Sequence, residues 1–248
     1  MIPALSVVIP TLDAAATLEA ALRALGGVPG EMVVADGGSG DGTPALARRL
    51  GARVVQGTRG RGQQLAAGVA AASGSWLLLL HADTRLQPGW EAAVRAHLAE
   101  PFGGNPEPAG YFRFALDSAD PRARRLERLV AWRCRAWSLP YGDQGLLVSR
   151  RTLDAAGGMP ELALMEDVAL VRRIRRRLGR GGVVALDAVA LTSAARWERD
   201  GWWRRSVRNL ACLGLWRLGV PAGMIARLYA PRPRTAAARG AQDRGARG

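Results

Sequence analysis

Three aspartates follow apolar runs that have the length and composition of buried strands. Asp13 follows residues 5–9, Asp36 follows residues 32–35, and Asp83 lies at the end of the run 75–84. Open α/β sheets place their ligands at the carboxyl ends of such strands. Carboxylates repel phosphates, but they can hydrogen-bond a base or a ribose, or hold a divalent cation that neutralises a diphosphate. The spacing therefore predicts nucleotide or metal chemistry at one edge of a sheet.

Two common phosphate-binding loops are excluded, and simpler roles remain open for two of the aspartates. A Walker loop requires Gly-Lys-Ser/Thr, and the chain contains no Lys. The dinucleotide fingerprint G-x-G-x-x-G should follow the first strand, where residues 10–13 read Pro-Thr-Leu-Asp. Taken alone, Asp13 can be the N-cap of the next helix and Asp36 can be a turn former.

Strand and helix patterns alternate over residues 5–100. Strands are predicted at 5–9, 32–35, 53–56 and within 75–84, with helices between them. This rhythm predicts an α/β fold with a mainly parallel central sheet and helices on both faces. Farther on we expect an exposed strand at 111–114, a basic helix at 121–137, a strand at 183–186 and helical structure over 202–229.

A helix predicted over residues 166–178 carries a further acidic candidate. Asp167 is in line with Val171, Ile174 and Leu178, which we expect to face inward, whereas Glu166 is expected on the opposite side. A carboxylate on a buried face is costly unless it has a function or a partner there. The alternative is an acid that only stabilises the helix dipole.

Composition indicates a globular protein with a strong positive charge. The 248 residues are 48% hydrophobic and 23% charged, and all 35 cations are Arg, which gives a formal net charge of +14. This charge predicts a general attraction to phosphates or anionic lipid. Cys134 and Cys212 have no metal-ligand or disulfide spacing, and no signal peptide or spanning segment is apparent, so we expect a cytoplasmic protein, with the inner face of the cell membrane as a further location.

Four motifs in order and spacing resemble the family 2 glycosyltransferases, which have the GT-A fold. They are Leu5-Ser6-Val7-Val8-Ile9-Pro10-Thr11, Val33-Val34-Ala35-Asp36-Gly37-Gly38-Ser39-Gly40-Asp41-Gly42-Thr43, Leu80-His81-Ala82-Asp83 and Glu166-Asp167. The resemblance extends over roughly residues 5 to 200. Within the family the chain looks most like a small bacterial group, some members of which are associated with arsenosugar biosynthesis.

The resemblance implies a role for each matching residue. Asp167 is the expected catalytic base, and Asp83 is the expected ligand of a divalent metal, Mn or Mg, because it matches the last Asp of the family's D-x-D motif. His81 replaces the first Asp of that motif, so it can be a metal ligand, a contact of the donor sugar or a packed strand-end residue. The residues expected to bind the nucleotide-sugar are Pro10, Thr11, Asp13, Asp36, Gly37, Arg59, Arg61, Gly62, His81, Ala82, Asp83 and Arg196. Those expected on the acceptor side are Asp143, Gln144, Glu166 and Trp197.

Residues 193–197 and the segment after them remain open to several interpretations. Ser193-Ala194-Ala195-Arg196-Trp197 is similar to the Q-x-x-R-W motif of processive members, but Ser replaces Gln, which argues against a polymerase. The following aromatic and Arg residues fit a helix packed on the catalytic domain, a contact with anionic lipid, or nucleic-acid binding. We expect a glycosyltransferase domain at 1–200, an amphipathic helical segment at 201–230 and a disordered tail at 231–248.

The resemblance predicts a metal-assisted, inverting glycosyltransferase of the hexosyltransferase type. Its donor would be a nucleotide-sugar, most simply a UDP-sugar, and its acceptor hydroxyl would belong to a small or lipid-linked molecule. No specific nucleic-acid partner is expected, and peripheral membrane contact stays open. The alternatives are another nucleotide-handling enzyme, such as a sugar nucleotidyltransferase, and a non-enzymatic basic protein that binds lipid or nucleic acid.

Overall fold

One mixed sheet of eight strands forms the centre of the part of the chain that the structure describes. The computed structural model describes residues 1–103 and 106–229, and the strand order is β3-β2-β1-β4-β7-β6-β8-β5. The strands are β1 (Ile2–Thr11), β2 (Pro29–Asp36), β3 (Arg53–Gln56), β4 (Trp76–Leu79), β5 (Thr84–Leu86), β6 (Ala109–Asp117), β7 (Leu146–Ser149) and β8 (Val183–Ser193). The predicted tail at 231–248 lies outside the described residues.

The first four strands of this order are parallel, and the direction changes beyond them. β1 pairs in parallel with β2 and β4, and β2 with β3. β7 is antiparallel to β4 and β6, β8 is parallel to β6, and β5 is antiparallel to β8. The predicted mainly parallel sheet is therefore confirmed, with antiparallel strands on one side of it. The carboxyl ends of β1, β2 and β4 meet at one edge.

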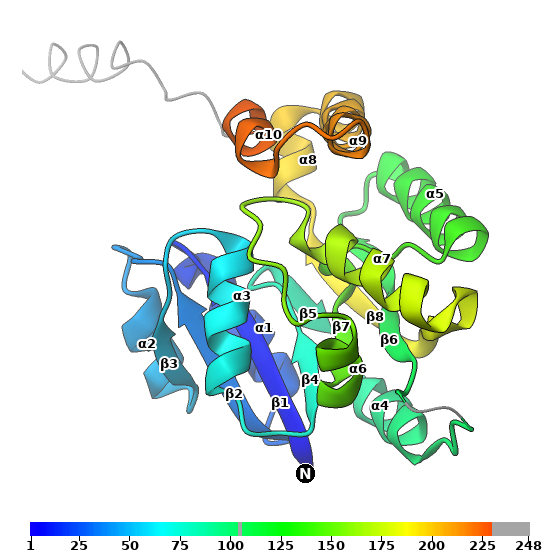
Figure 1. Ribbon diagram of the computed structural model, residues 1–248. Coiled ribbons are helices and arrows are strands. Elements are labelled where there is room, and N and C mark those ends of the chain that lie inside the picture. The colour runs from blue at the N-terminus through cyan, green and yellow to red at the C-terminus, as the bar shows by residue number, and fades with distance from the viewer. Residues whose placement is uncertain (104–105, 230–248) are drawn as a thin grey trace, which may run out of the picture.

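Helices pack on both faces of the sheet, as predicted (Figure 1). They are α1 (Ala15–Leu25), α2 (Thr43–Arg49), α3 (Arg61–Ala71), α4 (Trp90–Ala99), α5 (Pro121–Trp137), α6 (Arg150–Ala155), α7 (Glu166–Leu178), α8 (Ala195–Asp200), α9 (Trp202–Arg217) and α10 (Ala222–Tyr229), with 3-10 turns η1 (Gly142–Gln144) and η2 (Arg180–Gly182). The predicted bounds of α5 and α7 agree with the structure. α5 begins where it does because Asp120 accepts a hydrogen bond from the Arg122 amide and Pro121 follows the cap.

The apolar run before Asp83 is buried on both faces of the sheet. Leu77 and Leu79 belong to a cluster with residues of α3, α5 and α7. Leu78 and Leu80 belong to a second cluster with residues of α1, α2 and α4. Successive side chains of a strand point to opposite faces, so a strand covered on both sides is apolar throughout. This explains the unbroken apolar sequence that ends at His81.

The C-terminal helices lie at the opposite end of the sheet from the N-terminus, near the carboxyl end of β1 (Figure 1). The guanidinium of Arg172 on α7 lies 5.1 Å from the ring centroid of Trp216, and that of Arg122 on α5 lies 5.8 Å from that of Trp202. α9 is therefore docked on α5 and α7. Among the described residues no helix combines the length and apolar composition that crossing a bilayer requires.

Two local predictions were wrong. Residues 111–114 belong to β6, an interior strand, and Tyr111, Phe112 and Phe114 are buried because the sheet continues through β8 and β5. Asp13 is not a helix cap: Ala14 is the N-cap of α1, and Asp13 has a φ of 49°. The predicted helical structure over 202–229 is confirmed; it is divided into two helices, because Gly219 has a φ of 89° and Pro221 follows it.

Candidate active site

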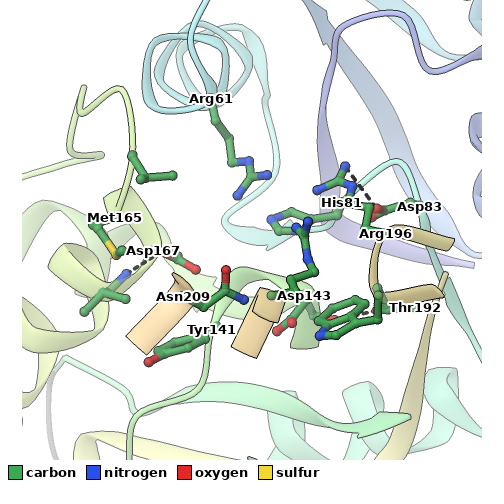
Figure 2. Close-up of a pocket in the computed structure, with 14 residues that line it drawn as sticks. Arg61, His81, Asp83, Tyr141, Asp143, Met165, Asp167, Thr192, Arg196 and Asn209 are labelled. Carbon is green, nitrogen blue, oxygen red and sulfur yellow. Dashed lines mark hydrogen bonds and ion pairs between the residues drawn. The ribbon is translucent and has the colours of Figure 1, made fainter. Parts of the chain in front are cut away.

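A cavity of about 110 Å³ lies where the ends of β4 and β8 meet the first turn of α7. We call it the central cavity. In Figure 2, Arg61 reaches it from α3, with His81, Asp83 and Arg196 on one side and Asp167 and Met165 on the other. Its lining consists of Arg61, His81, Asp83, Tyr141, Asp143, Leu164, Met165, Asp167, Val168, Thr192, Arg196, Trp197, Arg205 and Asn209. Segments far apart in the sequence thus contribute titratable groups to one small space.

Asp83 is fixed by the end of β8 rather than by its own strand. β4 ends at Leu79, and the Thr84 amide donates to the carbonyl of His81 (3.1 Å), so residues 81–83 form a turn before β5. The Ser193 amide donates to the Asp83 carbonyl at 3.0 Å. The Asp83 carboxylate forms an ion pair with Arg196 of α8, at 3.2 Å. The antiparallel pairing of β5 and β8 therefore brings Arg196 to the acidic residue.

His81 is a neutral imidazole in this setting. Burial, followed by the positive charges of Arg61 and Arg196, lowers the pKa of His81 well below its ordinary value of 6.5. A neutral ring has a lone pair available for a cation or for a hydrogen bond. His81 is therefore able to serve as a ligand at physiological pH.

Asp167 lies next to His81, across Gly142. The Gly142 amide donates to Oδ2 of Asp167 at 2.6 Å, and the Val168 amide donates to Oδ1 at 2.7 Å. A Cβ at Gly142 would lie 2.6 Å from Nε2 of His81 and 3.2 Å from Oδ2 of Asp167. Glycine is thus required at this position for the imidazole and the carboxylate to approach each other.

Asp143 contributes a buried carboxylate oxygen that lacks a hydrogen-bond partner. Burial, opposed by Arg133 and reinforced by Asp167 and Asp83, raises the pKa of Asp143 to about 6. Its Oδ1 is buried and unpartnered. Thr192 donates its hydroxyl to the Asp143 carbonyl at 2.9 Å, which anchors this turn to the end of β8. The negative charges of Asp167 and Asp83 therefore favour the protonated form of Asp143 in the central cavity.

The predicted orientation of Glu166 was wrong. Its side chain is only 1% exposed and lies 3.5 Å from Arg61, measured between Oε1 and the guanidinium nitrogen. Burial, partly offset by Arg61 and reinforced by Asp167, raises the pKa of Glu166 to about 7. The periodicity argument considered one buried face of α7, whereas the structure buries Glu166, Val168, Ala169, Leu170, Val171 and Ile174. Glu166 does not line the central cavity.

A second cavity, of about 310 Å³, lies beside the end of β1, and we call it the first-strand cavity. It shares Arg61, His81, Asp83 and Arg196 with the central cavity. Its remaining lining residues are Pro10, Thr11, Leu12, Asp13, Ala14, Thr17, Gln64, Ala82, Ser193 and Ala195. Eight of the residues expected to bind the nucleotide-sugar meet here: Pro10, Thr11, Asp13, Arg61, His81, Ala82, Asp83 and Arg196.

Four residues expected to bind the nucleotide-sugar do not line these cavities. The buried carboxylate of Asp36 accepts hydrogen bonds from Thr11, Ser39 and the Gly38 amide. A Cβ at Gly37 would lie 2.8 Å from Nε2 of Gln64. Arg59 is exposed, and the amide of Gly62 donates to the Leu162 carbonyl. Nucleotide contact by Asp36, Gly37, Arg59 and Gly62 stays a prediction.

Gln144 is a structural residue of the turn before β7 in this arrangement. It is 1% exposed. Its amide donates to the Phe112 carbonyl at 3.1 Å, and its carbonyl oxygen accepts from Arg133 at 3.0 Å. It holds the turn that presents Gly142 and Asp143. An acceptor contact of Gln144 itself stays a prediction.

A third space, of about 320 Å³, lies between α5 and α9, and we call it the apolar groove. It shares Tyr141, Asp143, Trp197 and Asn209 with the central cavity. Its other lining residues are Phe114, Leu126, Leu129, Val130, Trp132, Arg133, Trp137, Ser206 and Leu210. Trp197, expected on the acceptor side, is 8% exposed and faces both spaces.

Several residues of the central cavity were missed in the sequence. Thr192 ends a strand that was predicted to stop at residue 186, so its pairing with Thr84 (Oγ1 to Oγ1, 2.9 Å) was not foreseen. Asn209 lies on α9, where the aromatic and basic pattern gave no hint of a cavity-lining amide. Tyr141 precedes the Gly-Asp-Gln turn. That polar turn was the one feature of the sequence that could have indicated Tyr141 as a cavity-lining residue.

The possible ligand atoms of the central cavity fit a divalent cation only if a bound phosphate group completes its coordination. Asp83 offers a carboxylate, His81 a neutral nitrogen, and Asp143 an unpartnered buried oxygen. Within residues 1–103 and 106–229, no three His, Cys, Asp or Glu side chains form a ready metal-binding group. Mg²⁺ is commonly held by one or two carboxylates together with substrate phosphates. The residues therefore fit a cation whose remaining ligands come from a diphosphate.

The chain is similar to known glycosyltransferases. The family model described as Glycosyl transferase family 2 matches residues 6–151, more than half of the 248 residues. A structure of glucosyl-3-phosphoglycerate synthase from Mycobacterium tuberculosis, with Mn²⁺, UDP-glucose and phosphoglyceric acid, is 23% identical over 88% of this chain and 80% of that chain, with a TM-score of 0.59. The complex of the same enzyme with Mn²⁺, UDP and glucosyl-3-phosphoglycerate is 24% identical over the same shares, with a TM-score of 0.57. No curated protein matches the chain. The predicted GT-A type of α/β fold is confirmed.

Proposed function

This chain belongs to glycosyl transferase family 2, and on that premise we propose that it transfers a sugar from a UDP-sugar to an acceptor hydroxyl, with inversion at the anomeric carbon. The observation that carries the proposal is the continuity of the first-strand cavity with the central cavity. The residues they share, Arg61, His81, Asp83 and Arg196, lie between the space suited to a nucleoside and the carboxylate of Asp167. A donor and an acceptor can thus meet at one point.

The donor diphosphate is held by the shared residues in this proposal. Arg61 and Arg196 supply guanidinium groups, which suit diphosphate oxygens because they donate several hydrogen bonds in a fixed plane. The nucleoside lies beside Pro10, Thr11 and Asp13. The UDP and UDP-glucose in the similar synthase structures support uracil as the base.

Asp83 and His81 are the protein ligands that we propose for Mn²⁺ or Mg²⁺. The Mn²⁺ in the similar synthase structures supports this assignment. When bound, the cation neutralises the negative charge that develops on the departing diphosphate. Arg61 and Arg196 add positive charge at the same place.

Asp167 is the general base of the proposed reaction. Its carboxylate removes the proton of the acceptor hydroxyl while the hydroxyl oxygen bonds to the anomeric carbon and the bond from that carbon to the diphosphate oxygen breaks. The amides of Gly142 and Val168 hold the two carboxylate oxygens, so the base is oriented before the acceptor arrives. In this proposal Asp143 lies beside the molecule that receives the sugar. Its Oδ1, which has no hydrogen-bond partner, can accept a hydrogen bond from that molecule.

The family match favours sugar transfer over a sugar nucleotidyltransferase and over a non-enzymatic binding protein. The phosphoglyceric acid in the similar synthase supports a small acceptor, although it identifies none for this chain. The narrower resemblance to the group associated with arsenosugar biosynthesis stays a prediction. The apolar groove bears on the acceptor and is considered separately below.

A thermal-shift experiment tests the donor assignment. The protein is heated with UDP, GDP, dTDP or NAD, each with and without Mn²⁺. We expect UDP with Mn²⁺ to stabilise the folded protein most. A ligand at a hundred times its Kd adds about 2.7 kcal/mol to the free energy of unfolding, which is readily measured. Asp83→Asn should abolish the part of the shift that requires Mn²⁺. Asp187→Asn, at a 98% exposed carboxylate that lines neither cavity, is the matched control. No stabilisation by any nucleoside diphosphate with Mn²⁺ would overturn the proposal.

A further inference from the structure

The apolar groove is open to solvent although most of its lining is hydrophobic. Leu129 and Trp132 of α5 are 54% and 51% exposed, and Leu210 of α9 is 63% exposed. Trp132 and Trp137 stack edge to face, with ring centroids 5.0 Å apart, along the α5 side. Contiguous exposed apolar surface of this kind is typical of a site that binds a ligand, a membrane or another protein.

The groove leads into the central cavity. The residues common to both, Tyr141, Asp143, Trp197 and Asn209, form the boundary between them. Tyr141, Asp143 and Asn209 lie together on one side of the cavity in Figure 2, across from Arg61. A molecule whose hydroxyl lies at Asp167 therefore has a continuous path into the apolar groove.

The walls of the groove are held in place independently of any ligand. Arg205 of α9 packs on Trp197, 5.1 Å from guanidinium to ring centroid, and pairs with Asp200 at 2.9 Å. The Arg133 guanidinium lies 3.5 Å from the Tyr141 ring centroid. These contacts tie α9 to α8 and α5 to the turn before β7, so the groove is a feature of the packed helices.

Residues 230–248, which lie outside the described part of the chain, contain no apolar segment that could fill the groove. Residues 230–248 contain no Val, Leu, Ile, Met, Phe, Trp or Tyr, but they contain several Arg. The outer surface of α5 also carries exposed Arg125, Arg128 and Arg135. Apolar surface that contains Arg133 in its lining and lies on an Arg-rich helix is complementary to an amphiphile with an anionic or polar head.

We propose that the apolar groove binds the hydrocarbon chain of an amphiphilic acceptor, whose hydroxyl then lies at Asp167. This inference rests on the proposed transferase function and selects the lipid-linked class from the two acceptor classes that the sequence left open. The boundary residues hold the polar head: Asn209 and Tyr141 offer hydrogen bonds, and Asp143 offers its unpartnered oxygen. The first-strand cavity does not contact the hydrocarbon chain in this proposal.

A fluorescence experiment locates the hydrocarbon chain directly. The probe is dodecyl maltoside brominated in its alkyl chain, used below its micelle concentration, because bromine quenches tryptophan only at close contact. We expect saturable quenching from Trp132, Trp137 and Trp197, and none with maltose. Leu210→Arg should weaken the probe about tenfold, since it replaces an apolar wall of the site with a charge. Leu218→Arg, at an 85% exposed leucine outside the groove, should bind as the unchanged protein does.

The outcomes separate this inference from the donor assignment. The shift with UDP and Mn²⁺ should be the same in Leu210→Arg, Leu218→Arg and the unchanged protein. Absence of quenching, or equal quenching in both variants, would overturn the groove assignment and leave the donor assignment intact. Conversion of a dimer to a monomer by Leu210→Arg, seen by sedimentation, would identify a second copy of the chain as the occupant and would also overturn it.

Discussion

The first-strand cavity and the apolar groove have nearly the same volume, about 310 and 320 Å³, yet their linings are opposite in character. The first contains charged side chains of both signs, among them Asp13, Arg61, Asp83 and Arg196. The second is mostly tryptophan, leucine and phenylalanine. The central cavity lies between them and shares four residues with each. The comparison shows that polarity, rather than size, distinguishes the two approaches to Asp167.

The two spaces also come from different parts of the chain. The first-strand cavity draws on residues 10–83 and on 193–196. The groove draws on residues 114–210, from the antiparallel side of the sheet and the helices that follow. The matched family region, 6–151, contains eleven of the fourteen residues that line the first-strand cavity and nine of the thirteen that line the groove. The other four groove residues lie on α8 and α9. We therefore expect this wall of the groove to be the part that is particular to this chain.

The largest effect should come from removing the base between the two spaces. Asp167→Asn keeps the size of the side chain but cannot accept the acceptor's proton, so sugar transfer should fall by about 10²- to 10⁴-fold. Binding of UDP with Mn²⁺ and quenching by the brominated probe should both persist. Initial rates and the two binding assays, compared with exposed Asp154→Asn, check this. Loss of nucleotide binding together with transfer would contradict the assigned role.

A smaller loss is expected when the space that His81 and Asp167 share beside Gly142 is filled. Gly142→Ala introduces a Cβ that would lie 2.6 Å from Nε2 of His81, so the ring and the carboxylate have to move apart. Displacement of a reacting group by about 1 Å can cost about 10²-fold in rate. We expect kcat to fall while probe quenching in the groove is retained. Gly27→Ala, where an added Cβ has no atom within 4 Å, is the control. An unchanged kcat would show that the close approach of Gly142 does not orient the base.

The smallest effect concerns Glu166, which holds Arg61 at the border of the two polar cavities. Because its pKa is raised from 4.5 to about 7 in the folded chain, the protonated form is favoured there, and stability falls as the pH rises through this window. Glu166→Gln imitates the protonated form. We expect it to raise Tm by a few degrees above about pH 7 and to change little near pH 4.5.

Thermal unfolding across that pH range measures this effect, with exposed Glu161→Gln as the control. A Tm that falls at every pH would show that the ion pair with Arg61 outweighs the burial of the charge. The stability of the region around the two polar cavities would then depend on a charged Glu166. Charged groups outside the cavity linings would then also distinguish this region from the apolar groove.

The sequence was informative where local pattern determines position. The apolar run before Asp83 predicted a strand buried on both faces, and helical periodicity predicted α7 with its correct bounds. Asp83 and Asp167 could be singled out because each interrupts such a pattern. These two residues do line one cavity.

The remaining parts of the site depend on contacts between distant segments. Thr192 and Asn209 reach the cavity only because β8 pairs with β5 and α9 docks on the helices before it. Glu166 was misplaced because periodicity identifies one buried stripe, whereas Arg61 of α3 lies against another side of α7. The apolar groove could not be predicted, because the sequence does not distinguish the exposed apolar residues of α5 from the buried ones.

If Asp83 binds the cation as proposed, its ion pair with Arg196 predicts that the cation and the donor bind in a linked order. In the free protein the guanidinium occupies the carboxylate that a cation would need, at 3.2 Å. A cation arriving alone must displace Arg196 and leave it without an anion, whereas a diphosphate arriving with the cation gives Arg196 a new partner. Each ligand therefore strengthens the binding of the other by the same factor, as thermodynamic reciprocity requires. Free Mn²⁺ would bind weakly, and release of the nucleoside diphosphate would return Arg196 to Asp83 and expel the metal.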